Sequence, residues 1–570
     1  MFPRFGVLFF EVSVLKELVV PIFENAFERA RAAGDLTSEE MPAVVIETPP
    51  NEAFGDFSCN IAMTLARAER KAPLMIAEQI VKHFEAPEGL VKDVRIEKPG
   101  FINLYLDGDY LCAKLKDILS APDDFGRNES GAGKSVYLEF VSANPTGPLH
   151  IGHGRGAALG DVLGRVLEAS GFRVHREYYI NDAGNQIETL AKSACARYLQ
   201  DVKGETVSFP EDGYQGEYIR EIVKSAEFRE CVGALRDEEA FLAQAGGIAK
   251  ELILEDIEKS LIEFRVRFDE WFSESSLFSE NGNKVEEAVA ALEANEKLYE
   301  KDGAKWLASS AYGDEKDRVV VRDDGRPTYL ASDIAYHNLK YERGFDHYIN
   351  IWGADHHGYL PRVRAAMEML GHDTEKLDVL FVQFVSLRRG GEAVQMSTRS
   401  GEFEELSAVV DEVGVDAARF FFLMRSADTA LEFDLDLAKE QSSENPVYYV
   451  QYAHARVCSL FRQAGEEDKL LDGLNEPMPG VLVLAEEHQL MKNLLEWPDV
   501  VRTAAERFEP HHVTFGLIAL AKQFHAYYNR NRILGQDEKL THARLCLAKC
   551  VQVVLKNGLD LLGVSAPEEM

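Results

Sequence analysis

The feature that most constrains the fold is the order of segments between residues 136 and 180. Residues 136–141 form a short apolar run of the kind found in buried strands, and a loop rich in glycine and proline follows. Residues 154–169 then carry a helical pattern, and residues 173–180 carry a second strand pattern. A strand, a helix and a strand in this order predict a βαβ unit, and therefore a parallel sheet.

A second set of strand-like runs supplies further strands for this sheet. A long, acidic, helical stretch at residues 186–265 separates the two sets. The arrangement predicts a nucleotide-binding fold that is split by a helical insertion. The runs of the second set lie at residues 328–330, 348–352 and 379–384.

Two further regions flank this fold. The first part of the chain mixes helical and strand-like runs, which predicts a small α+β unit that ends at a polar linker, residues 121–134. Beyond residue 403, apolar residues recur almost wholly at helical spacing, which predicts a helical bundle. The expected helices cover residues 15–33, 53–81 with a break at Pro73, 403–423 and 444–562, and the expected strands 43–46 and 101–106.

Charge and cysteine usage restrict the function. The 570 residues include 62 basic and 96 acidic side chains, a net charge of −34, which excludes a uniformly basic nucleic-acid binder. Any polyanion must therefore bind a local basic patch. The seven cysteines are scattered without a Cys-x-x-Cys pair, which favours a reducing compartment and no zinc site.

The apolar N-terminus does not predict a membrane or secreted protein. Glu11 interrupts it and no small-residue cleavage site follows, so we expect an ordinary strand or helix, or an overlong start, rather than a signal peptide. No apolar run of the sequence approaches the ~18 residues that span a bilayer. We therefore expect a cytoplasmic protein with no membrane partner.

The loop after the first strand carries the sharpest signal for chemistry. It reads SANPTGPLHIGHGRG from Ser142 to Gly156. In an open α/β sheet such a loop lies at the carboxyl edge, where nucleotides bind, and its glycines let backbone approach a ligand. His150 and His153 fall on one helical face, where they are expected to donate hydrogen bonds to a triphosphate in the transition state. A core or capping role is the alternative.

This loop resembles the HIGH motif of class I aminoacyl-tRNA synthetases, and further segments resemble bacterial arginyl-tRNA synthetases. They occur in the order of that family and span residues 54–570. The segments are EFVSANPTGPLHIGHGR, YYINDAGNQ, WFSES, TYLASDIAYH, GADHHGY, QMSTR, NPVYYVQYAHAR and LLGVSAPEEM.

The resemblance implies a multidomain α/β protein with a Rossmann-type class I catalytic domain, an N-terminal α+β tRNA-contact domain and an all-α C-terminal anticodon-binding domain. It implies ATP-dependent activation of L-arginine and transfer to the 2′-hydroxyl of the terminal adenosine of tRNA-Arg, with ATP and Mg²⁺ as cofactors. It also implies that activation waits for bound tRNA. We expect a monomer. The expected domains are residues 1–122 for tRNA contact, 130–390 for catalysis, 391–440 for the signature loop and connecting helices, and 441–570 for anticodon binding.

An arginine pocket follows from matching the family's motifs. A planar guanidinium calls for carboxylates and a flat aromatic partner, and Glu274, Tyr329 and Asp333 match the positions that supply them. On spacing alone such residues are more often solvated or structural. The positions for the α-ammonium group are matched by Ser142 and Asn144, with Glu139 as a further partner.

ATP is assigned to the loop and to the end of a later strand. Asp355 follows the apolar strand at residues 348–352, where an acidic side chain would meet a ribose hydroxyl. The adjacent His356 and His357 point in different directions and lack a third ligand, so we expect no metal site there. The expected ATP-binding residues are Gly147, Gly152, Asp355, Met396 and Ser397.

The second class I motif, a KMSKS loop, is degenerate here. It reads QMSTR, with Gln395 and Thr398 in place of both lysines. We expect Arg399, with His150 and His153, to act as a catalytic residue by neutralising the migrating charge of the β- and γ-phosphates. If the Arg399→Ala variant kept wild-type activation kinetics, that assignment would be dropped. Gly131-Ala-Gly-Lys134-Ser135 only imitates a P-loop, because Asn128 replaces the required glycine and a strand follows.

A local basic stretch is the expected tRNA site. Residues 521–557 carry seven Lys or Arg against two acids, interleaved with Phe524, Tyr527 and Tyr528. Aromatics beside cations suit unstacked loop bases, although a solvated basic helix with core aromatics gives the same pattern. The resemblance decides for anticodon binding, and it assigns the N-terminal unit to the tRNA elbow. The expected contacts are Phe54, Asn60, Tyr528, Arg530 and Arg532.

Two alternative functions remain open from the sequence. A class I synthetase for another amino acid would share the nucleotide loop but would not need the carboxylate pair. A catalytically silent tRNA-binding paralogue is suggested only by the degenerate QMSTR loop, and the intact His150 and His153 argue against it.

Overall fold

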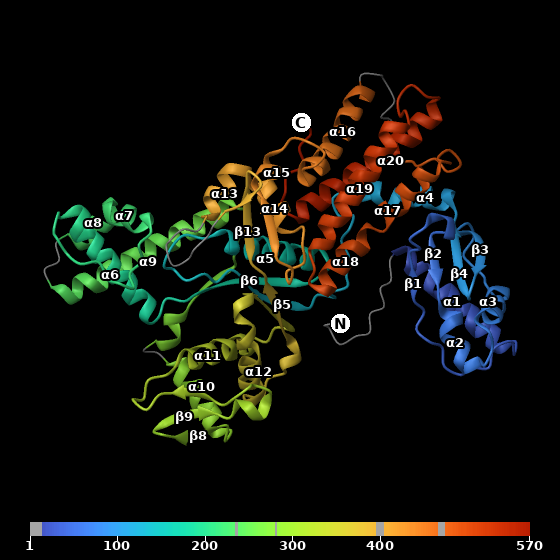
Figure 1. Cartoon of the computed structure of the whole chain (residues 1–570). Coiled ribbons are helices and arrows are strands. Elements are labelled where there is room, and N and C mark those ends of the chain that lie inside the picture. Colours follow the sequence, from blue (N-terminus) through green and yellow to red (C-terminus); the bar gives the residue numbers. More distant parts are fainter. Residues whose placement is uncertain (1–13, 234–236, 280–281, 395–403, 466–473) are drawn as a thin grey trace. The chain divides into compact units, whose positions relative to one another are not determined.

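The computed structural model describes residues 14–233, 237–279, 282–394, 404–465 and 474–570 (Figure 1). The chain divides into two compact units. The central unit comprises residues 129–441, and the terminal unit combines residues 1–128 with residues 442–570. The predicted signature-loop residues Met396, Ser397 and Arg399 lie outside the described residues.

A five-stranded parallel sheet forms the core of the central unit. Its order is β12-β11-β5-β6-β7, so the first of these strands along the chain, β5, lies in the middle. The chain adds β6 and β7 on one side of β5, and then β11 and β12 on the other. The predicted parallel sheet is confirmed. The strands are β5 (Ser135–Glu139), β6 (Arg173–Ile180), β7 (Glu270–Ser273), β11 (His347–Gly353) and β12 (Leu377–Val382).

Helices connect the strands and cover the sheet. Helix α5 (Ile151–Ala169), which follows β5, packs against β5 and β11. The strand expected at residues 328–330 is wrong, because α11 (Tyr329–Glu342) begins there and its apolar residues recur at helical spacing. Helix α11 shares one apolar core with α10 (Lys284–Ala294) and α12 (Leu360–Met369).

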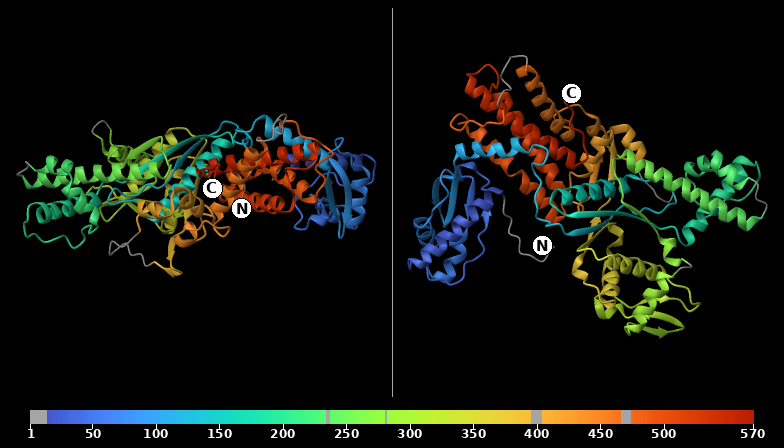
Figure 2. Two further views of the ribbon diagram at one scale, coloured as in Figure 1. Left: turned by 90° about the horizontal axis from the view of Figure 1, so that it is seen from above. Right: turned by 180° about the vertical axis from the view of Figure 1, so that it is seen from behind.

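The acidic stretch forms the predicted helical insertion. Its two longest helices, α6 and α9, pack against each other, and both views of Figure 2 show them side by side. The insertion leaves the sheet after β6 and returns to it at β7. Its helices are α6 (Asn185–Arg197), the π-helical η2 (Tyr198–Val202), α7 (Glu217–Lys224), α8 (Ala226–Val232) and α9 (Glu238–Glu263).

Two small sheets complete the central unit. One is antiparallel and precedes α11, and the other pairs the strand after β12 with a later one. The helix expected at residues 403–423 is divided at Gly414, whose φ of +83° ends one helix before the next begins. These elements are β8 (Leu298–Lys301), β9 (Ala304–Leu307), β10 (Arg318–Val321), β13 (Val385–Arg389), β14 (Glu392–Ala393), β15 (Leu431–Asp434), α13 (Leu406–Val413), α14 (Val415–Phe422) and α15 (Leu435–Lys439).

The N-terminal part of the terminal unit is an antiparallel sheet with helices. The sheet order is β1-β2-β4-β3. The predicted α+β character is correct, but the helical region expected at residues 53–81 contains a strand, β2. The elements are α1 (Val14–Ala32), β1 (Ile46–Glu47), β2 (Phe57–Cys59), α2 (Ile61–Glu69), α3 (Pro73–Lys82), β3 (Val91–Glu97) and β4 (Phe101–Leu106).

The C-terminal part of the terminal unit is the predicted helical bundle. Helix α4 (Gly108–Ser120), which lies before the expected boundary at residue 122, packs on α17 and α20 of this bundle. Within the described parts of the chain, no helix combines the length and apolar character that a membrane span requires. The bundle helices are α16 (Pro446–Gly465), α17 (Ala485–Leu495), α18 (Trp497–Arg507), α19 (His511–Arg530) and α20 (Glu538–Leu561).

Candidate active site

The sheet order places a ligand site between β5 and β11. The strand order reverses direction there, and in open α/β sheets ligands bind at the carboxyl ends of the strands beside that point. The loop that contains Ser142 and Asn144 follows β5, and Asp355 follows β11 in the short helix η5 (Ala354–Tyr359). Residues that the sequence selected from distant segments therefore share one edge.

His150 and His153 cap the first turn of α5. The Nδ1 atom of His150 accepts from the backbone N–H of Gly152 (3.1 Å) and of His153 (3.4 Å), and Nδ1 of His153 accepts from the N–H of His150 (3.3 Å). The rings stack with centroids 3.6 Å apart. The capping role that stood as the alternative is thus present, and it fixes the tautomer in which Nε2 carries the hydrogen.

Both histidines are held neutral. Burial lowers the pKa of His153 to about 3, with a smaller contribution from His150, and burial likewise lowers the pKa of His150. A neutral Nε2–H group donates a hydrogen bond without changing its charge as pH moves across the physiological range. The arrangement suits steady hydrogen-bond donation to a phosphate rather than proton transfer.

Gly152 and Gly154 of this loop permit different close contacts. A Cβ on Gly154 would lie 2.5 Å from Leu406, so this glycine lets α13 pack against α5 instead of admitting a ligand. A Cβ on Gly152 would lie 2.9 Å from the ring of His150. Leu406 also donates its backbone N–H to the carbonyl of Leu149 (2.8 Å), which ties the loop to residues just beyond 403.

The turn between β5 and the loop is strained. Val141 and Ser142 have φ values of +68° and +44°, a region that costs a non-glycine residue about 1–3 kcal/mol. The hydroxyl of Ser142 donates to Oε1 of Glu139 (3.0 Å) and accepts from the N–H of Tyr179 (3.2 Å). Asn144 is exposed and its side chain faces no described partner. Such strain persists only where neighbours over-determine the backbone.

Two carboxylates converge where the arginine pocket is predicted. We call Glu274, Tyr329 and Asp333 the arginine pocket. Glu274 follows β7 and is 3% exposed, and burial raises its pKa despite hydrogen bonds from Ser332 and Tyr179. Burial, followed by repulsion from Glu274 and Glu139, raises the pKa of Asp333 to about 7. A cation placed between these acids would remove that penalty.

Tyr329 is the residue predicted to supply the flat face of the pocket. It begins α11, one helical turn before Asp333, and is 50% exposed. A Cβ on Gly184 would lie 3.0 Å from its hydroxyl, and Gly184 has a φ of +86°. Glycine at this position therefore allows the loop after β6 to approach the tyrosine closely.

Asp182 holds the turn that carries Glu274, a role that the sequence did not reveal. Its carboxylate accepts from the hydroxyl of Ser273 (2.9 Å) and the N–H of Ser275 (2.9 Å), the residues on either side of Glu274. Lys250 of α9 pairs with it at 3.0 Å. The only available signal was that Asp182 lies within the YYINDAGNQ segment.

The insertion also contacts the loop at its other end. The hydroxyl of Tyr218 in α7 donates to the carbonyl of Thr146 at 2.5 Å. A Cβ on Gly147 would lie 3.1 Å from that tyrosine, so the predicted ATP-binding glycine packs beneath an insertion side chain. Nothing in the local sequence around Tyr218 indicates this role.

Asp355 lies at the predicted strand end. Its side chain is 69% exposed, and its Oδ1 lies 3.1 Å from Nδ1 of His356. A Cβ on Gly353 would lie 2.7 Å from the Asp355 carboxylate, so a larger residue there would displace this exposed side chain. His357 packs on Phe381 with ring centroids 3.7 Å apart.

One predicted tRNA residue of the bundle, Tyr528, packs against an arginine. Arg456 of α16 lies over the rings of Tyr452 (4.7 Å) and Tyr528 (4.9 Å), and it donates to Asn529 (3.3 Å). Arg530 and Arg532 are exposed beyond the end of this cluster. We call Tyr452, Arg456 and Tyr528 the stacking platform.

Other members of the basic stretch are structural. Phe524 and Tyr527 are buried, so both belong to the core of the bundle, as the alternative interpretation of this stretch expected. Arg544 is also buried and pairs with Glu487 at 3.0 Å. In the N-terminal sheet region Phe54 is 44% exposed, whereas the Oδ1 atom of Asn60 is buried without a partner among the described residues.

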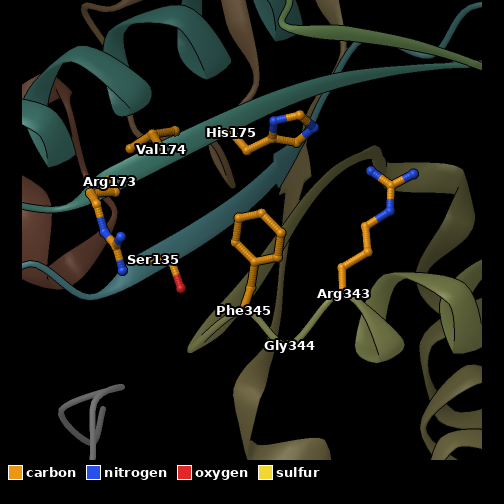
Figure 3. A pocket seen from close by; sticks show the side chains of 7 residues that line it. All are labelled: Ser135, Arg173, Val174, His175, Arg343, Gly344 and Phe345. Carbon is orange, nitrogen blue, oxygen red and sulfur yellow. The ribbon is translucent and has the colours of Figure 1, made fainter.

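A pocket of about 320 Å³ lies at the opposite edge of the sheet (Figure 3). Arg173, His175 and Arg343 line it with Phe345, near the amino ends of β5 and β6. Glu270 accepts from Arg343 (2.6 and 2.8 Å) and lies 3.1 Å from His175, so these polar groups are already paired. The pocket is not at the edge where ligands bind this fold.

The described residues contain one group of potential metal ligands, Glu509, His511 and His512 at the start of α19. One ligand atom of each of these residues lies within 4.8 Å of the others, and His512 bonds Glu509 (2.9 Å) and stacks on His511. The group belongs to the terminal unit.

The parallel sheet and the capped loop with its HIGH motif are those of a class I aminoacyl-tRNA synthetase catalytic domain. The family model described as tRNA synthetases class I (R), catalytic domain, matches residues 114–434. The models for the arginyl-tRNA synthetase N-terminal domain and the DALR anticodon binding domain match residues 20–106 and 450–570.

Relatives named arginine–tRNA ligase are similar to this chain over almost its whole length. The arginine–tRNA ligase of Syntrophotalea carbinolica is 52% identical, with 94% of this chain and 96% of that protein covered. That of Geobacter sp. (strain M21) is 48% identical, with 98% and 100% covered. The Thermus thermophilus arginyl-tRNA synthetase structure gives a TM-score of 0.72 at 25% identity, covering 97% and 100%. The chain belongs to the arginyl-tRNA synthetase family.

Proposed function

We propose that this chain, an arginine–tRNA ligase by family, joins arginine and ATP at the edge between β5 and β11 and passes the arginyl group to tRNA-Arg. The observation that carries the proposal is the arginine pocket. Two carboxylates, Glu274 and Asp333, converge there with raised pKa values and no ion pair among the described residues. Relatives named arginine–tRNA ligase cover 98% of the chain.

The pocket selects arginine by charge and shape. Asp333 and Glu274 accept N–H groups of the guanidinium, which is planar and carries donors in a fixed fork. Tyr329 covers one face of that plane. Ser142 and Asn144 hold the α-ammonium group at the end of β5. A neutral side chain would leave both carboxylates buried and unpaired, so it is rejected.

Activation forms one bond and breaks another. A carboxylate oxygen of arginine attacks the α-phosphorus of ATP, and the bond to the bridging oxygen breaks, releasing pyrophosphate. The Nε2–H groups of His150 and His153 donate to phosphate oxygens as negative charge shifts toward the leaving group. Gly147, Gly152 and Asp355 seat the nucleotide. Arg399, with Met396 and Ser397, is proposed to complete the phosphate contacts.

Transfer releases AMP. The 2′-hydroxyl of the terminal tRNA adenosine attacks the arginyl carbonyl, and the bond to the AMP phosphate oxygen breaks. No covalent enzyme intermediate is needed, so the protein contributes positioning and charge stabilisation. Mg²⁺ is proposed to enter with ATP. It is usually held by phosphate oxygens with one or two carboxylates, which fits an edge where the described residues offer Asp355 but no cluster of ligands.

The terminal unit is proposed to hold tRNA. The stacking platform and the neighbouring Arg530 and Arg532 offer aromatic faces and cations to bases of the anticodon loop. Phe54 and Asn60 are proposed to contact the elbow, although the Oδ1 atom of Asn60 is buried. The predicted domain limits, a cytoplasmic location, a monomeric state and activation that waits for tRNA remain proposals of the same kind.

The test is ATP–pyrophosphate exchange with each of the twenty amino acids, with and without tRNA-Arg. We expect exchange with arginine alone and only in the presence of tRNA. Exchange with a different amino acid would overturn the pocket assignment. Tight tRNA binding without any exchange would point to the catalytically silent tRNA-binding paralogue and direct attention to residues 395–399.

A further inference from the structure

Lys340 is a buried cation beneath the active site that no step above uses. It lies in the last turn of α11 and is 2% exposed. Its Nζ atom lies 2.6 Å from Oε2 of Glu139 and 3.0 Å from Oδ1 of Asn350. Glu139 and Asn350 are register partners on β5 and β11. The lysine therefore joins the two strands between which the substrates are proposed to bind.

The ion pair continues into the strained turn. Glu139 uses its second oxygen to accept the hydroxyl of Ser142, while Lys340 occupies the first. Val141 and Ser142 both have left-handed backbone conformations. Ser142 is thus held by an acceptor whose own position and charge depend on Lys340.

A second branch leads from Lys340 to the arginine pocket. Asn350, which accepts from Lys340, donates to Nε2 of His337 (3.0 Å), and Nδ1 of His337 donates to the carbonyl of Asp333 (2.8 Å). Burial lowers the pKa of His337 to about 4, which keeps this neutral hydrogen-bonding pattern at physiological pH. Lys340 also faces the rings of Tyr336 and Tyr137, at 4.4 and 5.2 Å, and its charge partly offsets the rise in the pKa of Glu177 that burial causes.

We propose that Lys340 is a positioning residue for the bound amino acid: it fixes Glu139, which holds the Val141–Ser142 turn and so aims Ser142 and Asn144 at the α-ammonium group of arginine. The inference rests on the proposed function of this edge. In this proposal Glu139 acts indirectly, by orienting Ser142. Both carboxylate oxygens of Glu139 already accept hydrogen bonds within the protein.

The charge state of Glu139 supports this role. Burial alone would raise the pKa of Glu139, but Lys340 lowers it, and the carboxylate stays ionised at neutral pH. Without the lysine, a carboxyl group buried this deeply would take up a proton. The turn would then lose an anionic acceptor, and the strained backbone would relax.

The experiment compares three variants in arginine-dependent ATP–pyrophosphate exchange with tRNA present. Lys340→Met removes the cation. The double variant Glu139→Gln with Lys340→Met removes both charges and keeps an amide oxygen as acceptor for Ser142. Tyr336→Phe is the matched control, because Tyr336 is buried on the same helix but donates its hydroxyl to Glu177 on β6. Thermal unfolding of each variant accompanies the kinetics.

We expect Lys340→Met to lower kcat/KM for arginine about 100-fold, the loss that follows from a misplaced substrate, while KM for ATP stays within about twofold. The double variant should have a kcat/KM for arginine at least about tenfold higher than that of Lys340→Met. Tyr336→Phe should lower the melting temperature and leave both KM values unchanged.

Three outcomes would overturn the inference. They are a Lys340→Met enzyme with wild-type kinetics, a double variant that recovers nothing, and equal loss for ATP and arginine. Failure of the proposed function is distinguished from these, because the wild-type protein would then show no arginine-dependent exchange. If Lys340→Met does not fold, the double variant decides, since the proposal requires it to retain arginine specificity.

Discussion

Two sets of carboxylates near the five-stranded sheet differ in their ion pairing and in the direction in which their pKa values are shifted. Glu139 lies 2.6 Å from the ammonium group of Lys340, and this cation holds its pKa below the usual range. Glu274 and Asp333 form no ion pair among the described residues, and burial raises the pKa of both. Glu139 ends β5 and Glu274 follows β7 of the five-stranded sheet, whereas Asp333 lies in the second turn of α11.

The difference separates a structural role from a recognition role. A buried acid without a cation is unfavourable when ionised. Glu139 has its cation within the chain and acts on the backbone. Glu274 and Asp333 have no ion pair among the described residues, and we propose that the guanidinium of arginine supplies the cation. An unpaired acid in a predicted substrate pocket is therefore a candidate for substrate recognition.

The largest effect is expected from Asp333→Asn. Arginine-dependent kcat/KM should fall about 10³-fold or more, because a buried charged contact to the guanidinium is lost. The same change should raise the melting temperature at pH 8, since it removes an acid that is unfavourable when ionised. Exchange kinetics and thermal unfolding measure the two effects.

Asp314→Asn is the matched control for that prediction. Asp314 is also buried, but it has its cation in the protein, with Arg318 at 2.7 Å. Its substitution should lower the melting temperature and leave KM for arginine unchanged. If both variants lost stability alike, the distinction between paired and unpaired acids would fail.

Lys250→Met tests whether the insertion positions the pocket. Asp182 would lose its cation and repel Glu274, so KM for arginine should rise about tenfold while KM for ATP stays unchanged. Lys250→Arg should restore most of the affinity. Glu251→Gln, on the exposed side of the same helix, is the control. Equal changes in both KM values would show a general loosening of the insertion instead.

The pH dependence of arginine binding provides a third test. Asp333 must be ionised to hold the guanidinium, so affinity should rise as pH increases through about 7, by up to about tenfold per pH unit below it. The folded pKa of Asp333 exceeds its unfolded value of about 4. Its contribution to stability is therefore present below pH ~4 and is lost as pH rises through about 7. Calorimetric titration between pH 5.5 and 8.5 measures the affinity, and an Asp333→Asn protein should lack the dependence.

The smallest effect is expected at the stacking platform. Arg456→Ala should weaken tRNA binding about tenfold, because it removes a cation that lies over two aromatic rings. Affinity for arginine should not change. Lys522→Ala, exposed on α19, is the control and should act mainly through the salt dependence of binding. Equal effects of both variants would indicate only a diffuse basic surface.

The sequence predicted the parts of the site that have a local pattern. The strand before Ser142, the helix start at His150 and His153, and the acidic residue after β11 all follow from short-range spacing, and the structure has them at one edge. Glu274, Tyr329 and Asp333 came from the resemblance, because their spacing alone does not separate a pocket from a solvated surface.

The supporting residues could not be predicted in this way. Lys340 and Glu139 are 201 positions apart, and Lys250 reaches Asp182 across 68. Such pairs leave no periodicity in the chain, since they join α11 to β5 and α9 to the loop after β6. For Phe524 and Arg544 the sequence was misleading. The composition of residues 521–557 resembled a nucleic-acid-binding surface, but both side chains are buried inside the bundle.

The most direct test compares arginine with citrulline, its neutral analogue of nearly equal shape, in ATP–pyrophosphate exchange. Wild-type protein should prefer arginine about 10³-fold or more. The Asp333→Asn variant should reduce that preference about 100-fold, because exchange with arginine falls and not because exchange with citrulline rises. A preference that is unchanged in Asp333→Asn would contradict the claim that the unpaired carboxylates are the place of the guanidinium.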